Sequence, residues 1–175
     1  MRMDTVSPMD TLEDFIAHAI ALEEDSAIRF DDMADALDVH QNHEVTVLFR
    51  KMAHFSRLHL AEAQKLAEGL TLPRFKPWEY KWPQAEPPET PELDATHYLM
   101  TPHHALVMAL ESEKRGHAYY AGLAQSHANA RIRELAQEFA EEEAEHVALL
   151  EAMMAKYPAP PADWDEDMDP PVSVD

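Results

Sequence analysis

The chain has 175 residues and a formal net charge of −20, with 46% hydrophobic and 27% charged residues. This length suits one domain with its own hydrophobic core. The negative charge argues against nucleic acid and anionic membranes as ligands, because both attract Lys and Arg. The lack of cysteine excludes disulfides, thiol catalysis and iron–sulfur clusters. No signal peptide or transmembrane run is recognisable, so we expect a cytoplasmic protein.

Apolar residues recur at helical spacing in two segments of the first half, and the chain contains only 3 glycines. The first segment begins behind Asp10, which forms a capping-box pattern with Glu13, and extends to Leu37. The second covers about residues 44–68, with Gly69 placed to end it. We therefore predict two helices here.

The second half shows two more helical segments. The third begins at Thr101 as N-cap, with Pro102 at the first helical position, and runs through Leu123. The fourth covers about residues 130–157 and is ended by Pro158. The chain is therefore predicted to be all-α.

The connections between these segments are unequal in length. Short loops join the first two helices and the last two, so each pair is expected to form an antiparallel hairpin. The long stretch of about residues 70–101 would then cross the length of the bundle and make the middle helices parallel. We predict a four-helix bundle over residues 1–157, followed by an acidic, proline-rich tail, residues 158–175. Such a composition favours disorder unless the tail docks on a partner.

The two halves resemble each other in sequence. The segment AIALEEDSAIRFDDMA aligns without gaps on ALESEKRGHAYYAGLA, which pairs Glu23 with Glu113. The segment VTVLFRKMAHFSRLH aligns on IRELAQEFAEEEAEH, which pairs His59 with His146. Polar residues thus recur at matching core-facing positions of both predicted hairpins.

These polar residues interrupt apolar stripes. Glu143 and His146 continue the stripe of the fourth helix and, being three residues apart, lie on one face. Glu23 and Glu113 occupy similar places, and a buried carboxylate requires a partner. A common metal ion would supply one. Glu24 and Glu111 are the alternative inward residues on the first and third helices. We expect a solvated position for the remaining acidic residues of the fourth-helix run, Glu141, Glu142 and Glu145.

This pattern resembles the ferritin-like diiron-carboxylate superfamily, most closely its rubrerythrin branch, over roughly residues 10–157. The resemblance implies a ferritin-like bundle that binds iron, normally two ions, and reduces hydrogen peroxide or O₂. It also implies that the donor of electrons is a separate protein, because the cysteine-ligated iron domain usual in rubrerythrins is absent, and it suggests a homodimer. The ligand positions that it carries over are Glu23, His59, Glu113, Glu143 and His146.

One family position does not match, because Ser56 stands where a glutamate is expected three residues before His59. The site could remain dinuclear with His117 or Glu62 as a substitute ligand. It could hold one ion, chiefly on Glu113, Glu143 and His146, or it could be a structural remnant. The set of carboxylates and imidazoles suits iron, manganese or zinc. Iron binding or storage without turnover is therefore the alternative to an oxidoreductase of the peroxidase or ferroxidase type.

Aromatic residues form two further groups. Tyr119 and Tyr120 are expected to pack inside the bundle. Trp78, Tyr80 and Trp82 alternate in the long crossover and are expected to cover the bundle or a subunit partner. The sequence identifies no partner for His18.

Overall fold

The computed structural model describes residues 10–39, 42–83, 88 and 101–162, and no strand occurs within them. Four long helices, α1 (Leu12–Val39), α2 (His43–Leu66), α3 (Pro102–Ser126) and α4 (Ala130–Met154), are accompanied by a 3₁₀ turn, η1 (Pro77–Glu79). Helix α1 packs along α2, and α3 along α4, as two hairpins. The predicted four-helix bundle of the ferritin-like type is therefore confirmed.

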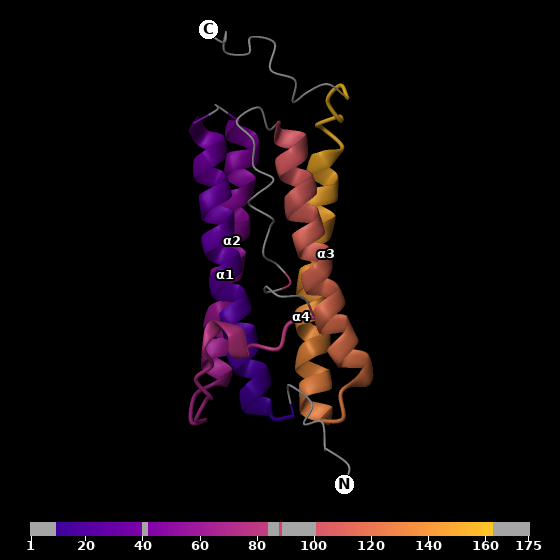
Figure 1. Ribbon diagram of the computed structural model, residues 1–175. Coiled ribbons are helices and arrows are strands. Elements are labelled where there is room, and N and C mark those ends of the chain that lie inside the picture. Colours follow the sequence, from indigo (N-terminus) through magenta and orange to yellow (C-terminus); the bar gives the residue numbers. More distant parts are fainter. Residues whose placement is uncertain (1–9, 40–41, 84–87, 89–100, 163–175) are drawn as a thin grey trace, which may run out of the picture.

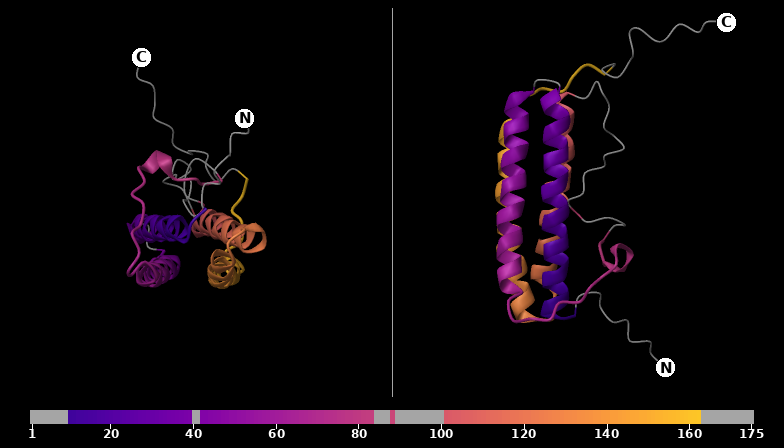
Figure 2. Two further views of the ribbon diagram at one scale, coloured as in Figure 1. Left: turned by 90° about the horizontal axis from the view of Figure 1, so that it is seen from below. Right: turned by 90° about the vertical axis from the view of Figure 1, so that its left-hand side faces the viewer.

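The two hairpins lie side by side. Seen end-on, the four helices occupy the corners of a square, with α1 beside α3 and α2 beside α4 (Figure 2). Helices α2 and α3 run in the same direction, because α3 begins at the end of the bundle where α2 also begins (Figure 1). This arrangement directs one face of each helix to a common centre.

Thr11 caps the start of α1: its Oγ1 accepts a hydrogen bond of 3.1 Å from the backbone N–H of Asp14. The prediction that Asp10 fills this role was wrong by one residue. At the end of α2, Gly69 has a φ of +80°, a conformation that favours glycine, and the helix gives way to a turn just before it. The predicted stop is confirmed.

The second hairpin starts each helix with a side-chain cap. Thr101 Oγ1 accepts from the backbone N–H of His104, and Pro102 follows the cap, as predicted. Asn129 Oδ1 accepts from the backbone N–H groups of Arg131 and Ile132, at 2.9 Å and 3.3 Å. Helix α4 itself ends at Met154, and the chain continues in turns to residue 157.

Two apolar clusters fill the bundle, one at each end. The cluster at the end where α1 begins contains Phe15, Leu22, Tyr119, Tyr120, Ile132 and Phe139 among others. The cluster at the other end contains Phe30, Phe49, Met52, Leu106 and Leu150 among others. Along every helix a short polar stretch separates the two clusters. We call this the polar layer; its members are Glu23, Ser26, Ser56, His59, Ser112, Glu113, Glu143 and His146.

His18 fastens the crossover to α1. Its fully buried ring donates from Nδ1 to the carbonyl oxygen of Asp14 at 2.8 Å and accepts at Nε2 from the backbone N–H of Lys81 at 3.1 Å. Tyr80 and Trp82 pack edge-on against the same ring, so the predicted covering role is confirmed for both. Trp78, by contrast, is 77% exposed and does not cover the bundle.

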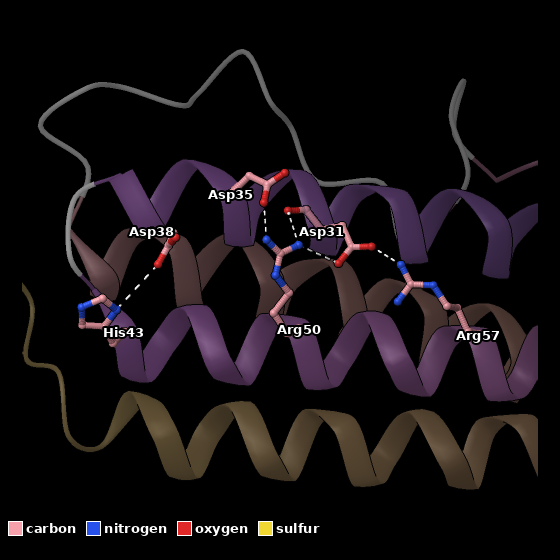
Figure 3. Close-up of polar contacts among 6 residues, drawn as sticks. All are labelled: Asp31, Asp35, Asp38, His43, Arg50 and Arg57. Carbon is pink, nitrogen blue, oxygen red and sulfur yellow. Dashed lines mark hydrogen bonds and ion pairs between the residues drawn. The ribbon is translucent and has the colours of Figure 1, made fainter.

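Ion pairs join α1 and α2 on their outer surface (Figure 3). Arg50 contacts both Asp31 and Asp35, and Arg57 contacts Asp31 from the other side. His43 Nδ1 lies 3.6 Å from Asp38 Oδ1 near the loop. Because these groups are largely exposed, each pair contributes little, and the apolar clusters carry most of the stability.

Some of the predicted segments lie outside the described residues. Residues 84–87 and 89–100 of the crossover and residues 163–175 of the predicted tail are not among the described residues. Within the described part, no helix has an apolar stretch long enough for a bilayer crossing.

Candidate metal centre

The polar layer contains two groups of potential metal ligands that share one residue. Glu23, His59 and Glu143 form the first group, and Glu113, Glu143 and His146 form the second. Within each group, one carboxylate oxygen or imidazole nitrogen per residue lies within 4.8 Å of the others. The structure thus brings together all five residues singled out in the sequence, and Glu143 is common to both groups.

In the second group, His146 lies between two buried carboxylates. Its Nδ1 is 3.1 Å from Glu113 Oε2 and 3.4 Å from Glu143 Oε2. Burial alone would lower the pKa of His146, but the hydrogen bonds to Glu113 and Glu143 outweigh it and raise this pKa to about 10. The metal-free protein therefore holds a proton where a cation would bind.

Glu143 is fully buried, and this environment disfavours its ionised form. Burial, together with the charge of Glu113, raises the pKa of Glu143 to about 8. At neutral pH Glu143 and His146 are thus both largely protonated in the metal-free protein.

In the first group, His59 directs Nδ1 to the centre. This atom lies 3.8 Å from Glu23 Oε1 and 3.9 Å from Glu143 Oε1. Burial, and then the charge of His146, lowers the pKa of His59 to about 4. The ring is therefore neutral at physiological pH, as a metal ligand must be.

The ring of His59 belongs to a stack of three rings. Its ring stacks on that of His146 at 5.1 Å between centroids, and His146 stacks on Phe55 at 5.2 Å. The interplanar angles are 12° and 10°. Both imidazoles are thus held parallel between α2 and α4.

Ser56 contributes no carboxylate to the polar layer. Its buried Oγ lies 3.0 Å from the Oγ of Ser26, and the two hydroxyls share a hydrogen bond. The substitute ligands considered from the sequence lie elsewhere. His117 donates from Nδ1 to the carbonyl oxygen of Ala140 at 2.8 Å, and Glu62 is exposed. Neither belongs to the two groups found among the described residues.

The prediction that Glu142 is solvated was wrong. Its side chain is 34% exposed, yet Oε2 is buried and lies 3.2 Å from Nε2 of His59. Burial, and then the charges of Glu62 and Glu143, raises the pKa of Glu142 to about 7. The helical stripe gave no signal for this contact, because Glu142 lies one position off the inward line.

The other acidic alternatives are placed as the stripes predicted. Glu24 and Glu111 are exposed while their neighbours Glu23 and Glu113 are buried, and the carboxylates of Glu141 and Glu145 are exposed.

A square bundle with carboxylates and histidines of four helices meeting at its centre defines a ferritin-like protein with a metal centre. The chain belongs to the rubrerythrin family. The family model described as Rubrerythrin matches residues 104–166. The crystal structure of an uncharacterized conserved protein from Magnetospirillum magnetotacticum MS-1 is also similar. It has 42% sequence identity and a TM-score of 0.73, over 86% of this chain and 97% of that one. No protein of curated function matches the chain significantly.

Family membership implies iron binding, and the residues present fit such a role. Both groups consist of carboxylate oxygens and imidazole nitrogens, donors that suit iron, manganese or zinc. Burial and the charge of Glu113 raise the pKa of Glu143, so a bound cation would favour the ionised form of this carboxyl.

Proposed function

We propose that the chain is a non-haem iron protein that binds two ions and reduces hydrogen peroxide or O₂, with electrons from a separate donor. The single observation that carries this proposal is the place of Glu143 in both ligand groups. One carboxylate reached by two sets of donors is the arrangement expected of a dinuclear centre. We expect the protein to act in the cytoplasm.

Each ligand group would hold one ion. Glu113, Glu143 and His146 would hold one ion at a fully buried position, and Glu23, His59 and Glu143 would hold the other. When bound, iron would supply the electrons by cycling between Fe(II) and Fe(III). The apolar clusters on either side exclude water from the layer, which strengthens the interaction of the carboxylates with a cation.

A second candidate is a protein that binds one ion, as a carrier or store without turnover. The hydrogen bond between Ser26 and Ser56 favours it, because this contact occupies the place of a further carboxylate beside His59. The two candidates differ in the number of ions and in the response to peroxide.

Metal analysis and single-turnover oxidation would test the proposal. Purified protein is loaded anaerobically with Fe(II), its iron is counted, and hydrogen peroxide is added while Fe(III) absorption is followed. Two ions per chain that are oxidised and can be re-reduced by an added donor support the proposal. One ion without repeated oxidation supports the carrier, and a stable protein without iron overturns both.

The variant Glu143→Gln tests the ligand assignment itself. It removes the shared carboxylate with little change in volume, so both ions should be lost. Glu141→Gln is the matched control, because Glu141 lies on the same helix and is exposed. Unchanged iron content in Glu143→Gln would refute the bridging role.

A further inference from the structure

The two ring nitrogens of His59 face different carboxylates. Nδ1 points to the centre, at 3.8 Å from Glu23 and 3.9 Å from Glu143, whereas Nε2 lies 3.2 Å from Oε2 of Glu142. The shortest of these three distances is therefore to the residue that lies outside both ligand groups.

Glu142 has one oxygen in need of a donor. Oε2 is inaccessible to solvent and accepts no hydrogen bond from the described part of the chain. A buried polar atom without a partner is costly, so the nearby Nε2 matters energetically. Hydrogen bonds of catalytic groups are often poorly aligned before a site is loaded, and a slight rotation of the carboxylate would align this one.

The identity of the protonated nitrogen decides what His59 can do. A neutral imidazole has one N–H and one lone pair, on opposite nitrogens. If Nε2 carries the proton toward Glu142, the lone pair is on Nδ1 and faces Glu23 and Glu143. The opposite tautomer would direct an N–H at these carboxylates and could not bind a cation there. The stacking on His146 fixes the ring plane, and the tautomer then decides which of the two nitrogens offers its lone pair.

We propose that Glu142 is a positioning residue, which accepts the Nε2 proton of His59 and thereby presents the Nδ1 lone pair to the metal centre. A carboxylate behind a ligating histidine commonly has this effect on metal sites. The effect of Glu142 on metal binding rests on the proposed function. The tautomer of His59, by contrast, can be observed without metal. The orientation of His59 matters more here because the first group has Ser56 where a further carboxylate is expected, so fewer ligands hold the cation.

The tautomer can be measured directly in the metal-free protein. Long-range ¹H–¹⁵N NMR spectra at neutral pH distinguish a protonated Nε2 from a protonated Nδ1 in His59. We expect the Nε2–H form in the wild type and in Glu142→Gln, whose carbonyl oxygen can still accept. Glu142→Leu should show a mixture of tautomers. An unchanged Nε2–H form in Glu142→Leu would overturn the proposal.

Metal binding gives the second readout. In titrations with Co(II), Glu142→Leu should weaken the binding of one of two ions by roughly 10- to 100-fold, while Glu142→Gln restores most of the affinity. Glu145→Gln, exposed on the same helix, is the control and should bind as the wild type does. Equal affinities in Glu142→Leu and the control would also refute the role.

The two experiments separate the inference from the proposed function. If the wild type binds no metal, the proposed function fails, and the NMR result still judges whether Glu142 selects the tautomer. If metal binds normally in all variants, the positioning role fails and the metal centre stands.

Discussion

The hydroxyl of Ser26 lies 3.0 Å from the hydroxyl of Ser56, at the centre of a bundle whose neighbouring polar groups are carboxylates and imidazoles. The two serines satisfy each other across α1 and α2. They form a neutral contact where a glutamate at position 56 would add a second charge next to Glu23. The first ligand group therefore has one carboxylate fewer than it would have with a glutamate at position 56.

This contact should be measurable as a coupling energy. Ser56→Ala leaves Ser26 Oγ buried without this partner, and we expect it to lower the free energy of unfolding by roughly 1 to 2 kcal/mol. Adding Ser26→Ala should recover part of the loss, because both polar atoms are then gone. Urea unfolding of the metal-free variants measures both effects. Ser126→Ala, at an exposed serine of α3, is the control, and additive losses in the double variant would contradict the pairing.

The variant Ser56→Glu should affect the metal-free and the loaded protein in opposite directions. Without metal, a further buried carboxylate near Glu23 and Glu143 lowers the melting temperature. With metal, the same carboxylate adds a ligand and should tighten binding at the first group. Melting curves with and without Fe(II), together with metal analysis, test this. If neither the metal-free melting temperature nor the metal affinity changes, position 56 does not face the centre.

Metal binding should release protons. Glu143 and His146 have pKa values of about 8 and about 10, so both are largely protonated in the metal-free protein at pH 7. An ion that takes their place should release about two protons, and its affinity should rise with pH. Calorimetric titration in buffers of different ionisation enthalpy counts these protons. In Glu143→Gln any residual metal binding should release at least one proton fewer than in the wild type. A release of almost no protons in the wild type would contradict this protonation pattern.

His18 should make the fold sensitive to mild acid. Burial lowers its pKa below the usual 6.5, although the carbonyl and charge of Asp14 act in the opposite direction. Between the folded and unfolded pKa values the unfolded chain binds more protons, so stability falls as pH decreases below about 6.5. His18→Phe keeps a ring but removes this titration. We expect the stability difference between wild type and His18→Phe to narrow on acidification, as measured by urea unfolding at pH 7 and pH 5.

The variant His18→Phe also loses the hydrogen bond from Lys81, so it is expected to be less stable at pH 7 and more readily cleaved by trypsin at Lys81. A difference in stability that stays constant between pH 7 and pH 5 would show that His18 does not titrate as its burial requires.

Helical spacing and the internal repeat pointed to a polar layer, and the resemblance to rubrerythrins selected its five candidate ligands, with Glu23 and Glu113 in place of Glu24 and Glu111. Glu143 and His146 lie on an apolar stripe, and the internal repeat extended the assignment to His59. These features depend on the period of one helix and on repetition, and both are present in a single sequence.

The contacts that escaped prediction depend on how elements meet. Glu142 reaches His59 only because of the rotation of α4 relative to α2, which the stripe of one helix does not determine. The partner of His18 is a backbone N–H in a crossover without periodicity, 63 residues further along the chain. At the start of α1, Asp10 and Thr11 are both good capping residues, and their local chemistry did not distinguish them.

The polar layer also has a consequence for the lifetime of the protein. Buried, partly protonated acids separate the two apolar clusters, and their burial without a cation costs stability. A cation that binds only the folded chain would stabilise it by mass action. Under metal shortage a larger fraction of molecules would open at the centre and become accessible to proteases. The abundance of this protein would then follow the supply of the ion it binds, with no regulator other than its own folding equilibrium.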